Sequence, residues 1–565
     1  MRTWILPLLP LIACTASAQL TNEQKLADLR QLSGIYAKQY GPYEWKRDVI
    51  GFDALDLQPW LDRALLTQSD IDFMDLCVEY VASLNDAHDV VSFPTNFNAQ
   101  LGFSTDLYDG KALVDSLSRT LLPQSRYPFV VGDELVSLDG IPVEEWLRRL
   151  AKYSIAANPR STARNAAVRT TSRSQSRIPW APRTGDSAEV VIRRASGDLE
   201  TYTIPWTKTG VPIPYFGPLP SPAERAARQR KSLDDFLAFE DSLQPWQLPL
   251  AHLLNASIPQ DGQAVLNSGA LRPIFALPQG FQIRLGNSAA TEAFTSGSYT
   301  SDGLRIGFIR IPSMSPGIGT TAALTQFENE ILWMQTNTDG LIIDVMRNPG
   351  GSVLYVEQLC QRLTPYTFRS LGFEYRPLAA DVVSFTSTLN SARAAGQPDW
   401  VIAGYEARLR DIESAYRENR GRTGPISLTQ PWLDLPAWPS AYTKPIVVLV
   451  DDFSASGGDA FPATLQDNGR ALLAGYRTMG AGGNVIDIAG ATYSEASTRV
   501  TRSLMNRKHP TVTPDYPAAP YIENIGVRPD VELDYMTRDN LMNGGRPFVE
   551  AFTRIAVDHI RKSAN

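Results

Sequence analysis

A serine in a glycine-rich turn is the first feature of this chain that could do chemistry. The segment "PIVVLVDDFSASGGDAFPATLQDNG" begins at Pro445 and passes from an apolar run into a helical pattern. A serine at such a junction can act as a nucleophile, because the N–H groups of a helix N-terminus favour a developing oxyanion. Gly457 and Gly458 directly follow Ser456, which fits this role better than Ser454. Taken alone, the pattern indicates no more than an ordinary N-cap serine.

A second glycine turn could supply the other side of an oxyanion hole. It lies in "GLIIDVMRNPGGS", where Gly350 and Gly351 follow an apolar run typical of a buried strand. Ligand sites in α/β sheets gather at the carboxyl ends of the strands. We expect Gly350 or Gly351 to contribute one backbone donor and Gly457 the other, although "NPGG" alone indicates only a turn.

Together the two segments resemble the core of the C-terminal processing (tail-specific) serine proteases. The resemblance rests on "GLIIDVMRNPGG" and, further along the chain, on "VLVDDFSASGGDAFPATLQDNGRALLAGYRTMGAGG". In that family the nucleophile lies in an "SAS" turn ahead of an acid, which implies Ser456 as the nucleophile and Asp459 at the acid position. The resemblance also implies a catalytic domain of the ClpP/crotonase-like type.

The general base is where this chain departs from the main branch of that family. The main branch uses a lysine in a turn resembling "TFGKG", but the matching turn here is "TMGAGG", with Ala481 at the lysine position. A serine needs an adjacent base, and histidine is the usual base near neutral pH. The chain has four histidines, which are His88, His252, His509 and His559.

His88 is the histidine that the resemblance selects. A branch that includes tricorn and the chlamydial protease-like activity factor uses a histidine from its N-terminal part, in a loop resembling "DGH". The segment "SLNDAHD" around His88 is similar. The same branch uses a glutamate in a stretch resembling "ENxGVxPD", which implies that Glu523 in "YIENIGVRPD" orients His88. Asp515 and Asp86 are the alternatives for this third position.

Residues 96–208 have the pattern of a small β-rich module. Two alternating runs flank the turn "ASGD", which is typical of a hairpin, and "AQLGFSTDLYDGKALVDSL" followed by "VVGDELVSLDGIPV" resembles a PDZ domain. The resemblance implies that Leu101, Gly102 and Phe103 form a loop that binds a peptide carboxylate through backbone amides. A purely structural module is the alternative.

The remaining segments predict the elements that must hold these residues. Residues 19–95 are predicted to be helical and to carry the His88 loop, and residues 209–298 form a linker or insert. In residues 299–565, continuous Val/Ile/Leu runs alternate with helical patterns, which predicts a sheet covered on both faces. The predicted fold is a multidomain α/β protein with an N-terminal helical region, a PDZ-like β-rich domain and a C-terminal α/β catalytic domain.

The N-terminus and the cysteines indicate where the protein works. The start "MRTWILPLLPLIACTASAQL" has a basic residue, a short apolar stretch and an Ala-Ser-Ala cleavage site, which predicts a signal peptide at 1–18 and export. A lipid anchor at Cys14 is the alternative. No other stretch is apolar enough to span a bilayer. The chain has 3 cysteines and no CxxC or HExxH motif, so we expect no metal and no other cofactor.

These observations converge on an exported serine endopeptidase with a Ser456–His88–Glu523 triad and protein or peptide substrates. The net charge of −7 over 565 residues gives no reason to expect nucleic acid. His88 and Ser456 lie far apart in sequence, so activity would depend on domain docking, and self-association or processing stays open. A catalytically inactive binding protein on the same scaffold is the main alternative. An α/β-hydrolase esterase is less favoured, because no G-x-S-x-G elbow surrounds Ser456.

Overall fold

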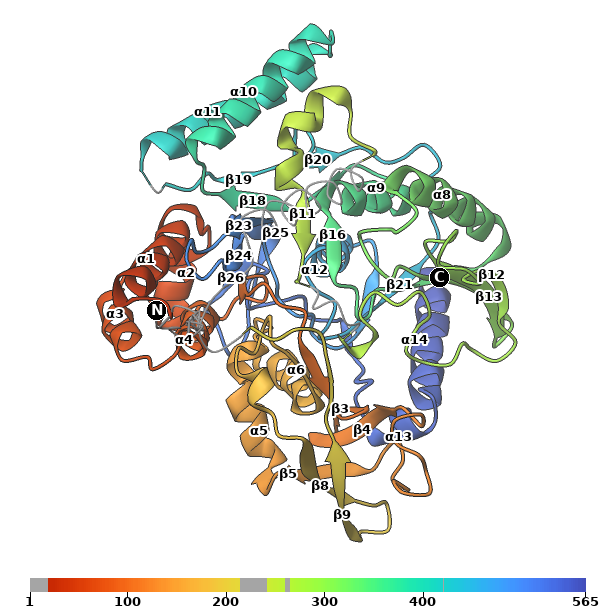
Figure 1. The fold of residues 1–565 in the computed structure, drawn as a ribbon. Helices are drawn as coiled ribbons and strands as arrows, with labels where there is room; N and C mark the ends of the chain where they lie inside the picture. The colour runs from red at the N-terminus through yellow and green to blue at the C-terminus, as the bar shows by residue number, and fades with distance from the viewer. Residues whose placement is uncertain (1–18, 214–240, 260–264, 420, 565) are drawn as a thin grey trace, which may run out of the picture.

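The protein has three parts that meet at one central junction. The computed structural model describes residues 19–213, 241–259, 265–419 and 421–564. Figure 1 shows a group of N-terminal helices, a β-rich module below them and a larger α/β domain. The predicted signal peptide at 1–18, with Cys14, lies outside the described residues. Within the described ranges, no helix has both the length and the apolar character to cross a membrane.

The N-terminal region is helical, as predicted, and two of its helices begin at side-chain N-caps. They are α1 (Asn22–Gln39), α3 (Gln58–Leu65) and α4 (Asp70–Ala82), with the short turns α2 (Tyr43–Trp45) and η1 (Lys46–Ile50) between them. Thr21 accepts a hydrogen bond from Gln24 N at the start of α1, and Ser69 accepts one from Asp72 N at the start of α4. Their apolar sides share one core with the β-rich module, so the two parts pack as one unit.

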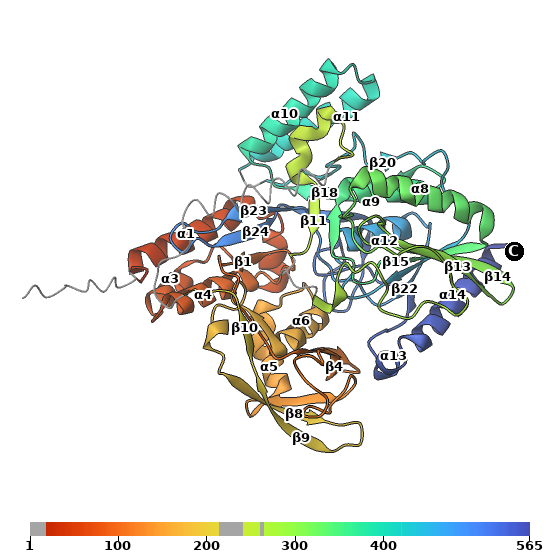
Figure 2. The same ribbon diagram turned by 45° about the vertical axis from the view of Figure 1, so that its right-hand side comes forward.

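A small antiparallel sheet joins the N-terminal helices to the α/β domain. Strand β1 (Val90–Ser92), which follows the His88 loop, pairs antiparallel with β24 (Ser497–Thr501), and β24 pairs with β23 (Val485–Ala489). Figures 1 and 2 both show α1 beside β23 and β24, and Tyr36 Oη lies 2.9 Å from Thr498 Oγ1. This pairing carries a residue from the N-terminal part into the C-terminal domain.

The β-rich module is a twisted sheet covered by two helices. Its strands run in the order β3 (Phe103–Tyr108), β4 (Lys111–Leu117), β5 (Glu134–Leu138), β8 (Ser187–Arg193) and β9 (Leu199–Pro205), and β6 (Ile141–Pro142) pairs with β5. The predicted hairpin across "ASGD" is β8–β9. Helices α5 (Val143–Leu150) and α6 (Pro159–Thr171) complete the module, and α6 packs on β3.

The α/β domain is built on a seven-stranded sheet. In spatial order its strands are β12 (Gln282–Leu285), β13 (Thr295–Ser301), β14 (Leu304–Arg310), β15 (Gly340–Asp344), β21 (Ile446–Val450), β22 (Leu472–Gly475) and β27 (Val531–Glu532). The strands from β14 to β27 are parallel, whereas β12 and β13 form an antiparallel edge. Strand β12 lies within the predicted insert, so the sheet takes in the end of that segment.

Helices cover both faces of this sheet, which confirms the prediction from its apolar strands. Ile343 of β15 packs with α8 (Thr320–Asn337), α9 (Val353–Leu363) and α12 (Gly457–Asp467). The neighbouring Ile342 points to the other face, where it packs with α14 (Arg546–Ala564). Because side chains alternate along a strand, a run with no polar position requires this double cover.

The other elements lie around this sheet. Helices α10 (Ala379–Ala394) and α11 (Asp399–Arg417) form a hairpin that projects from the top of the domain in Figure 1, and the sequence analysis made no prediction for it. The remaining elements include β2 (Asn98–Gln100), β7 (Ser172–Ser174), β10 (Thr207–Thr209), β17 (Phe368–Arg369), β18 (Gly372–Tyr375), β19 (Pro425–Ile426), β20 (Asp434–Leu435), β25 (Ser503–Thr511), β26 (Ala519–Tyr521) and α13 (Arg538–Met542).

Candidate active site

Ser456 stands at the N-terminus of α12, at the carboxyl end of β21. Its backbone has φ 57° and ψ −110°, a conformation that non-glycine residues rarely adopt and that clusters at functional sites. The Asp459 carboxylate holds this turn: it accepts hydrogen bonds from Ser456 N at 2.6 Å, Gly480 N at 3.0 Å and Ala481 N at 3.1 Å. Ala481, at the position of the family's lysine, therefore supports the turn through its backbone.

Replacing Asp459 with alanine should lower the free energy of unfolding by about 3 kcal/mol, because several buried N–H groups would lose their acceptor. Asp459 is 0% exposed, so water cannot replace the carboxylate without a rearrangement. Chemical denaturation monitored by circular dichroism measures the change. Asp558→Ala, at an exposed acid on α14, is the control and should stay within about 0.5 kcal/mol of wild type. Equal stability of the two variants would contradict this account.

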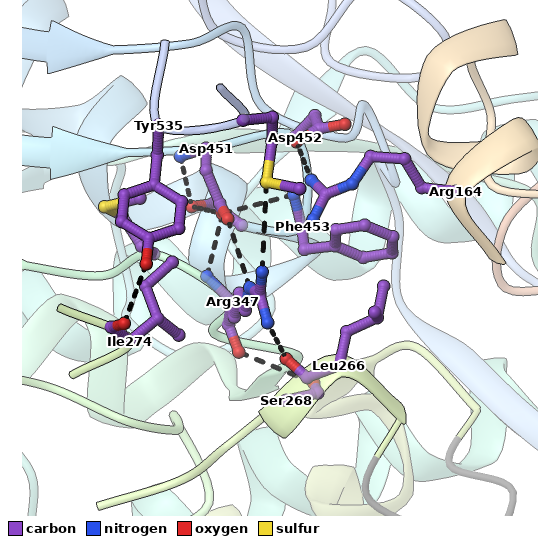
Figure 3. Close-up of polar contacts among 12 residues, drawn as sticks. Arg164, Leu266, Ser268, Ile274, Arg347, Asp451, Asp452, Phe453 and Tyr535 are labelled. Carbon is purple, nitrogen blue, oxygen red and sulfur yellow. Dashed lines mark hydrogen bonds and ion pairs between the residues drawn. The ribbon is translucent and has the colours of Figure 1, made fainter. Parts of the chain in front are cut away.

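The residues before Ser456 are fixed by arginines from two different parts of the chain. Asp451 Oδ1 accepts a hydrogen bond from Arg347 N at 2.8 Å. Asp452 pairs with Arg164 of α6, which stacks on the Phe453 ring at 4.5 Å. Figure 3 shows both arginines against this turn. The β-rich module thus helps to position the turn that carries Ser456.

Ser454 has a structural role in the same turn. Its hydroxyl donates to Val345 O at 2.9 Å, accepts from Asp451 N at 3.1 Å and is fully buried. The geometry therefore agrees with the preference for Ser456 over Ser454 as the candidate nucleophile.

His88 lies directly against Ser456, although the two are 368 positions apart. Its Nε2 is 2.8 Å from Ser456 Oγ. The loop is held from both sides: His88 N donates to Asp86 Oδ1 at 2.9 Å, and Asp89 Oδ1 accepts from Thr501 N of β24 at 2.8 Å. The pairing of β1 with β24 therefore brings the predicted base to the predicted nucleophile.

Two carboxylates lie near the His88 ring. Asp86 Oδ1 is 3.7 Å from His88 Nδ1, and one polar atom each from Asp86, His88 and Glu523 lie within 4.8 Å of one another. Among the described residues, no hydrogen bond reaches His88 Nδ1. Asp515 is exposed and faces Arg477. The structure thus brings Glu523 and the alternative Asp86 to the ring and leaves Asp515 at the surface.

Lys46 is a member of this cluster that the sequence analysis missed. Its ammonium forms an ion pair with Glu523, and both side chains are 0% exposed. The spacing of Asp86, His88 and Glu523 would suit a cation. However, Ser456 faces His88 Nε2 and Lys46 neutralises Glu523, so these residues fit a proton-transfer network better than a metal site. No motif around Lys46 signals this role.

Burial sets the protonation of the histidine and the glutamate. Burial lowers the pKa of His88 to about 4, opposed by Asp86 and assisted by Arg499 and Lys46. Burial also raises the pKa of Glu523 to about 7, where the charge of Asp86 adds to the shift and Lys46 opposes it. His88 is therefore neutral near pH 7 and able to accept a proton.

The three predicted oxyanion glycines lie together beside Ser456. Gly350 has φ 92°, and a Cβ there would lie 2.7 Å from Gly457 N and 2.8 Å from Ser456 Cβ, so a side chain cannot be accommodated. Gly350 N already donates to Asn348 Oδ1 at 2.9 Å. Gly457 N–H takes part in no hydrogen bond within the described part of the chain. Gly457 is therefore one available donor, and Gly351 is better placed than Gly350 for the second.

Strand β11 (Asn255–Ser257) covers these glycines. It pairs antiparallel with β16 (Gly350–Ser352), with Ala256 opposite Gly351. A Cβ on Gly350 would lie 2.2 Å from Ala256 O, so this carbonyl sits among the candidate oxyanion donors. Ser456 and Ala256 are each 0% exposed. A substrate strand would have to replace β11 to reach Ser456.

Comparison with known proteins places this geometry in a family. Residues 305–533 match the model of peptidase family S41, and residues 97–213 match that of a PDZ domain. Residues 305–533 are a peptidase family S41 domain. A protein of Chlamydia trachomatis serovar D is 27% identical to this chain over 615 residues, which cover 98% of this chain and 96% of the relative. An uncharacterized protein of Chlamydia muridarum is 26% identical over 608 residues, with 96% and 94% covered.

Solved structures share the whole architecture of this chain. The crystal structure of mature CPAF aligns with a TM-score of 0.75 at 22% identity and covers 96% of this chain and 99% of CPAF. The structure of mature CPAF complexed with lactacystin aligns with a TM-score of 0.74 at 23% identity, with the same coverage. At such identities the likeness establishes the fold. It confirms the predicted order of N-terminal helices, PDZ domain and α/β peptidase domain.

The predicted ligand loop of the PDZ domain has its first backbone amide engaged within the domain. Leu101 N donates to Thr171 O of α6 at 2.9 Å, and Leu101 and Phe103 are 1% and 6% exposed. A Cβ on Gly102 would lie 3.0 Å from Leu121 Cβ, so this side of the loop is covered as well. The Leu101 amide is already engaged, and peptide binding by this loop stays a prediction.

Proposed function

We propose that this chain is a serine endopeptidase in which Ser456 is the nucleophile and His88 the general base. The observation that carries the proposal is the 2.8 Å separation of His88 Nε2 and Ser456 Oγ at a helix N-terminus beside an unused Gly457 N–H. Nucleophile, base and oxyanion donor are the groups that peptide-bond hydrolysis through an acyl-enzyme requires. Export rests on the N-terminal sequence pattern alone.

The reaction follows from these positions. The Ser456 hydroxyl donates to His88 Nε2, so Ser456 Oγ can attack the scissile carbonyl carbon while its proton passes to the ring. The tetrahedral oxyanion accepts hydrogen bonds from Gly457 N–H and Gly351 N–H after β11 has left. The imidazolium then gives its proton to the leaving amine, and the C–N bond breaks to leave the acyl-enzyme. His88 next takes a proton from water, whose oxygen attacks the acyl carbon. The acid product leaves, and the proton returns to Ser456 Oγ.

Two carboxylates share the stabilisation of the imidazolium in this proposal. Asp86 is the nearer to Nδ1, whereas Glu523 carries the resemblance-based assignment. A carboxylate near Nδ1 stabilises the positive ring and fixes which nitrogen bears the proton. Both are therefore assigned as supporting acids, with Glu523 under the influence of Lys46.

Labelling with a fluorophosphonate tests the proposal directly. This reagent forms a covalent bond to an activated serine, so wild-type protein should gain one adduct, located at Ser456 by mass spectrometry of the peptides. Ser456→Ala should gain none. Ser454→Ala removes a hydroxyl two positions away in the same turn and should still be labelled. Equal labelling of wild type and Ser456→Ala, or an unlabelled wild type that also fails to cleave casein, would contradict the proposal.

A further inference from the structure

A lysine side chain is completely buried at the junction of the N-terminal helices and the peptidase domain. Lys46 lies in the turn η1, and its Nζ donates to Asn85 O at 3.0 Å and to Asn524 Oδ1 at 2.6 Å, in addition to its ion pair with Glu523. Lysine is almost never fully buried unless its charge is paired. Its three partners come from the loop that carries His88 and the loop that carries Glu523.

The carboxylate of Glu523 has few other groups that favour its charge. One oxygen pairs with Lys46, and the other accepts a hydrogen bond from Gly482 N at 2.9 Å. Asp86, a second carboxylate within the same cluster, opposes the ionisation of Glu523, as does complete burial. Without the ammonium, a buried carboxyl in this position would hold its proton.

We propose that Lys46 is a positioning residue that holds Glu523 beside His88 and keeps Glu523 ionised, so that this carboxylate can support the imidazolium. The inference rests on the proposed function, because it assigns Glu523 a part in the reaction. Lys46 touches neither Ser456 nor the candidate oxyanion donors in the described structure. It pairs with Glu523 directly, and its charge also lowers the pKa of His88.

Lys46 could also act by simply holding two loops together, and this role can be tested separately from its charge. The uncharged side chain of Asn524 also joins the loop of Glu523 to the loop of His88, as a neutral bridge. Asn524 Nδ2 donates to Asn85 O at 2.9 Å and to Ala157 O at 3.0 Å. Asn524 has φ 62°, a conformation that glycine also adopts readily. Asn524→Gly therefore removes the neutral bridge and the Asn524 Oδ1 acceptor of Lys46, but it preserves the backbone and both members of the Lys46–Glu523 ion pair.

Besides Lys46, several titratable groups either shift the pKa of Glu523 or have their own pKa shifted by its charge. They come from α1, from the loop after α4 and from the segment before β26, and the ring of His88 lies in the same cluster. These groups are Tyr40, Asp86, Asp89 and Tyr516. Lys46 is a cation that directly lowers the pKa of Glu523, so its removal should raise that pKa.

Thermal unfolding at a series of pH values tests the inference without reference to activity. The pKa of Glu523 is raised in the folded protein, so its contribution to stability is complete at low pH and is lost as the pH rises through the folded pKa. That loss should level off above about pH 7 in wild type but continue in Lys46→Met, whose Glu523 pKa is higher. The difference in Tm between the two proteins should therefore widen from pH 7 to pH 9.

The pH dependence of kcat is the second measurement. Wild type should lose activity on the acid side near pH 7, where Glu523 gains its proton. In Lys46→Met the acid side of the kcat profile (the acid limb) should move to higher pH by about 1 to 3 units. This is the usual effect on a carboxyl pKa of losing an opposite charge at ion-pair distance. Lys46→Arg keeps the charge and should keep the wild-type limb. Asn524→Gly should lower kcat at all pH values without moving the limb.

The outcomes separate the two proposals. A Tm difference that stays constant from pH 7 to pH 9, or a Lys46→Met acid limb that coincides with that of wild type, overturns the role of Lys46. A wild type without peptidase activity overturns the proposed function, and the Tm series still decides the state of Glu523. The double variant Lys46→Met, Glu523→Gln has no unpaired charge and should show no widening. If neither variant folds at any pH, Lys46 serves the fold and the inference is wrong.

Discussion

Replacing His88 with alanine should lower kcat by about 10⁴-fold and leave KM within a factor of about three, because the loss falls on proton transfer. In the structure Nε2 is 2.8 Å from Ser456 Oγ, and no second base lies as close in the described residues. Without the ring, Ser456 Oγ keeps its proton and is a weak nucleophile near neutral pH. Initial rates on a fluorogenic peptide and on casein measure the change.

His252→Ala is the matched control for this variant. The His252 side chain is 42% exposed and lies 3.6 Å from Asp381 of α10, so kcat of His252→Ala should stay within about twofold of wild type. The double variant Ser456→Ala, His88→Ala should lose no more activity than Ser456→Ala alone, because the two residues act as one unit. An active His88→Ala protein, or additive losses in the double variant, would rule out His88 as the base.

The sequence was sufficient to predict the fold and to select Ser456 and His88, which the structure places 2.8 Å apart, because local patterns and a family resemblance mark these features. The small residues after Ser456 are required where β16 and α12 approach closely, and such a requirement is visible as a glycine pattern. The strands of the central sheet are covered on both faces, so an unbroken apolar run in β15 or β21 predicts their burial. Ala481 stands at the lysine position, and among the four histidines the resemblance of "SLNDAHD" to the family's histidine loop selected His88.

The acid beside His88 was harder to predict, because it depends on distances across the chain. Asp86 is two positions from His88, and its carboxylate is bound by the backbone N–H of His88 itself, which no spacing rule indicates. Glu523 reaches the ring from the other end of the sequence. A motif can suggest either residue, but only the structure shows that both lie beside the ring and that Lys46 has neutralised one of them.

The cover over the site could not be predicted either. Strand β11 is three residues long, and "NAS" has neither the apolar alternation nor the β-branched content that marks a strand. It forms because β16 presents a free edge to it. Short strands of this kind are set by their partner rather than by their own sequence. The same reason explains why β12, within the predicted insert, joins the large sheet.

Replacing Ala256 with glutamate should raise the rate of fluorophosphonate labelling, and the rate of peptide cleavage, at least about tenfold, because the variant favours release of β11. Ala256 is 0% exposed, and beyond its methyl group lies a cavity of only about 10 Å³ among Val353, Phe373 and Met505. A buried, unpaired carboxylate costs several kcal/mol. The hydrogen bonds that hold a three-residue strand, at about 1 kcal/mol each, cannot offset this cost.

Ser257→Glu is the control that separates release of β11 from a general loosening of this segment. Ser257 is the next residue of the same strand, and because side chains alternate across a strand, its half-buried side chain points away from the cavity beside Ala256. The added charge can reach water there, so β11 should remain paired with β16 and labelling should proceed at the wild-type rate. If both glutamates accelerate labelling equally, general loosening of the segment is the cause. If Ala256→Glu is labelled more slowly than wild type, β11 is part of the working site, and a substrate must bind beside it rather than in its place.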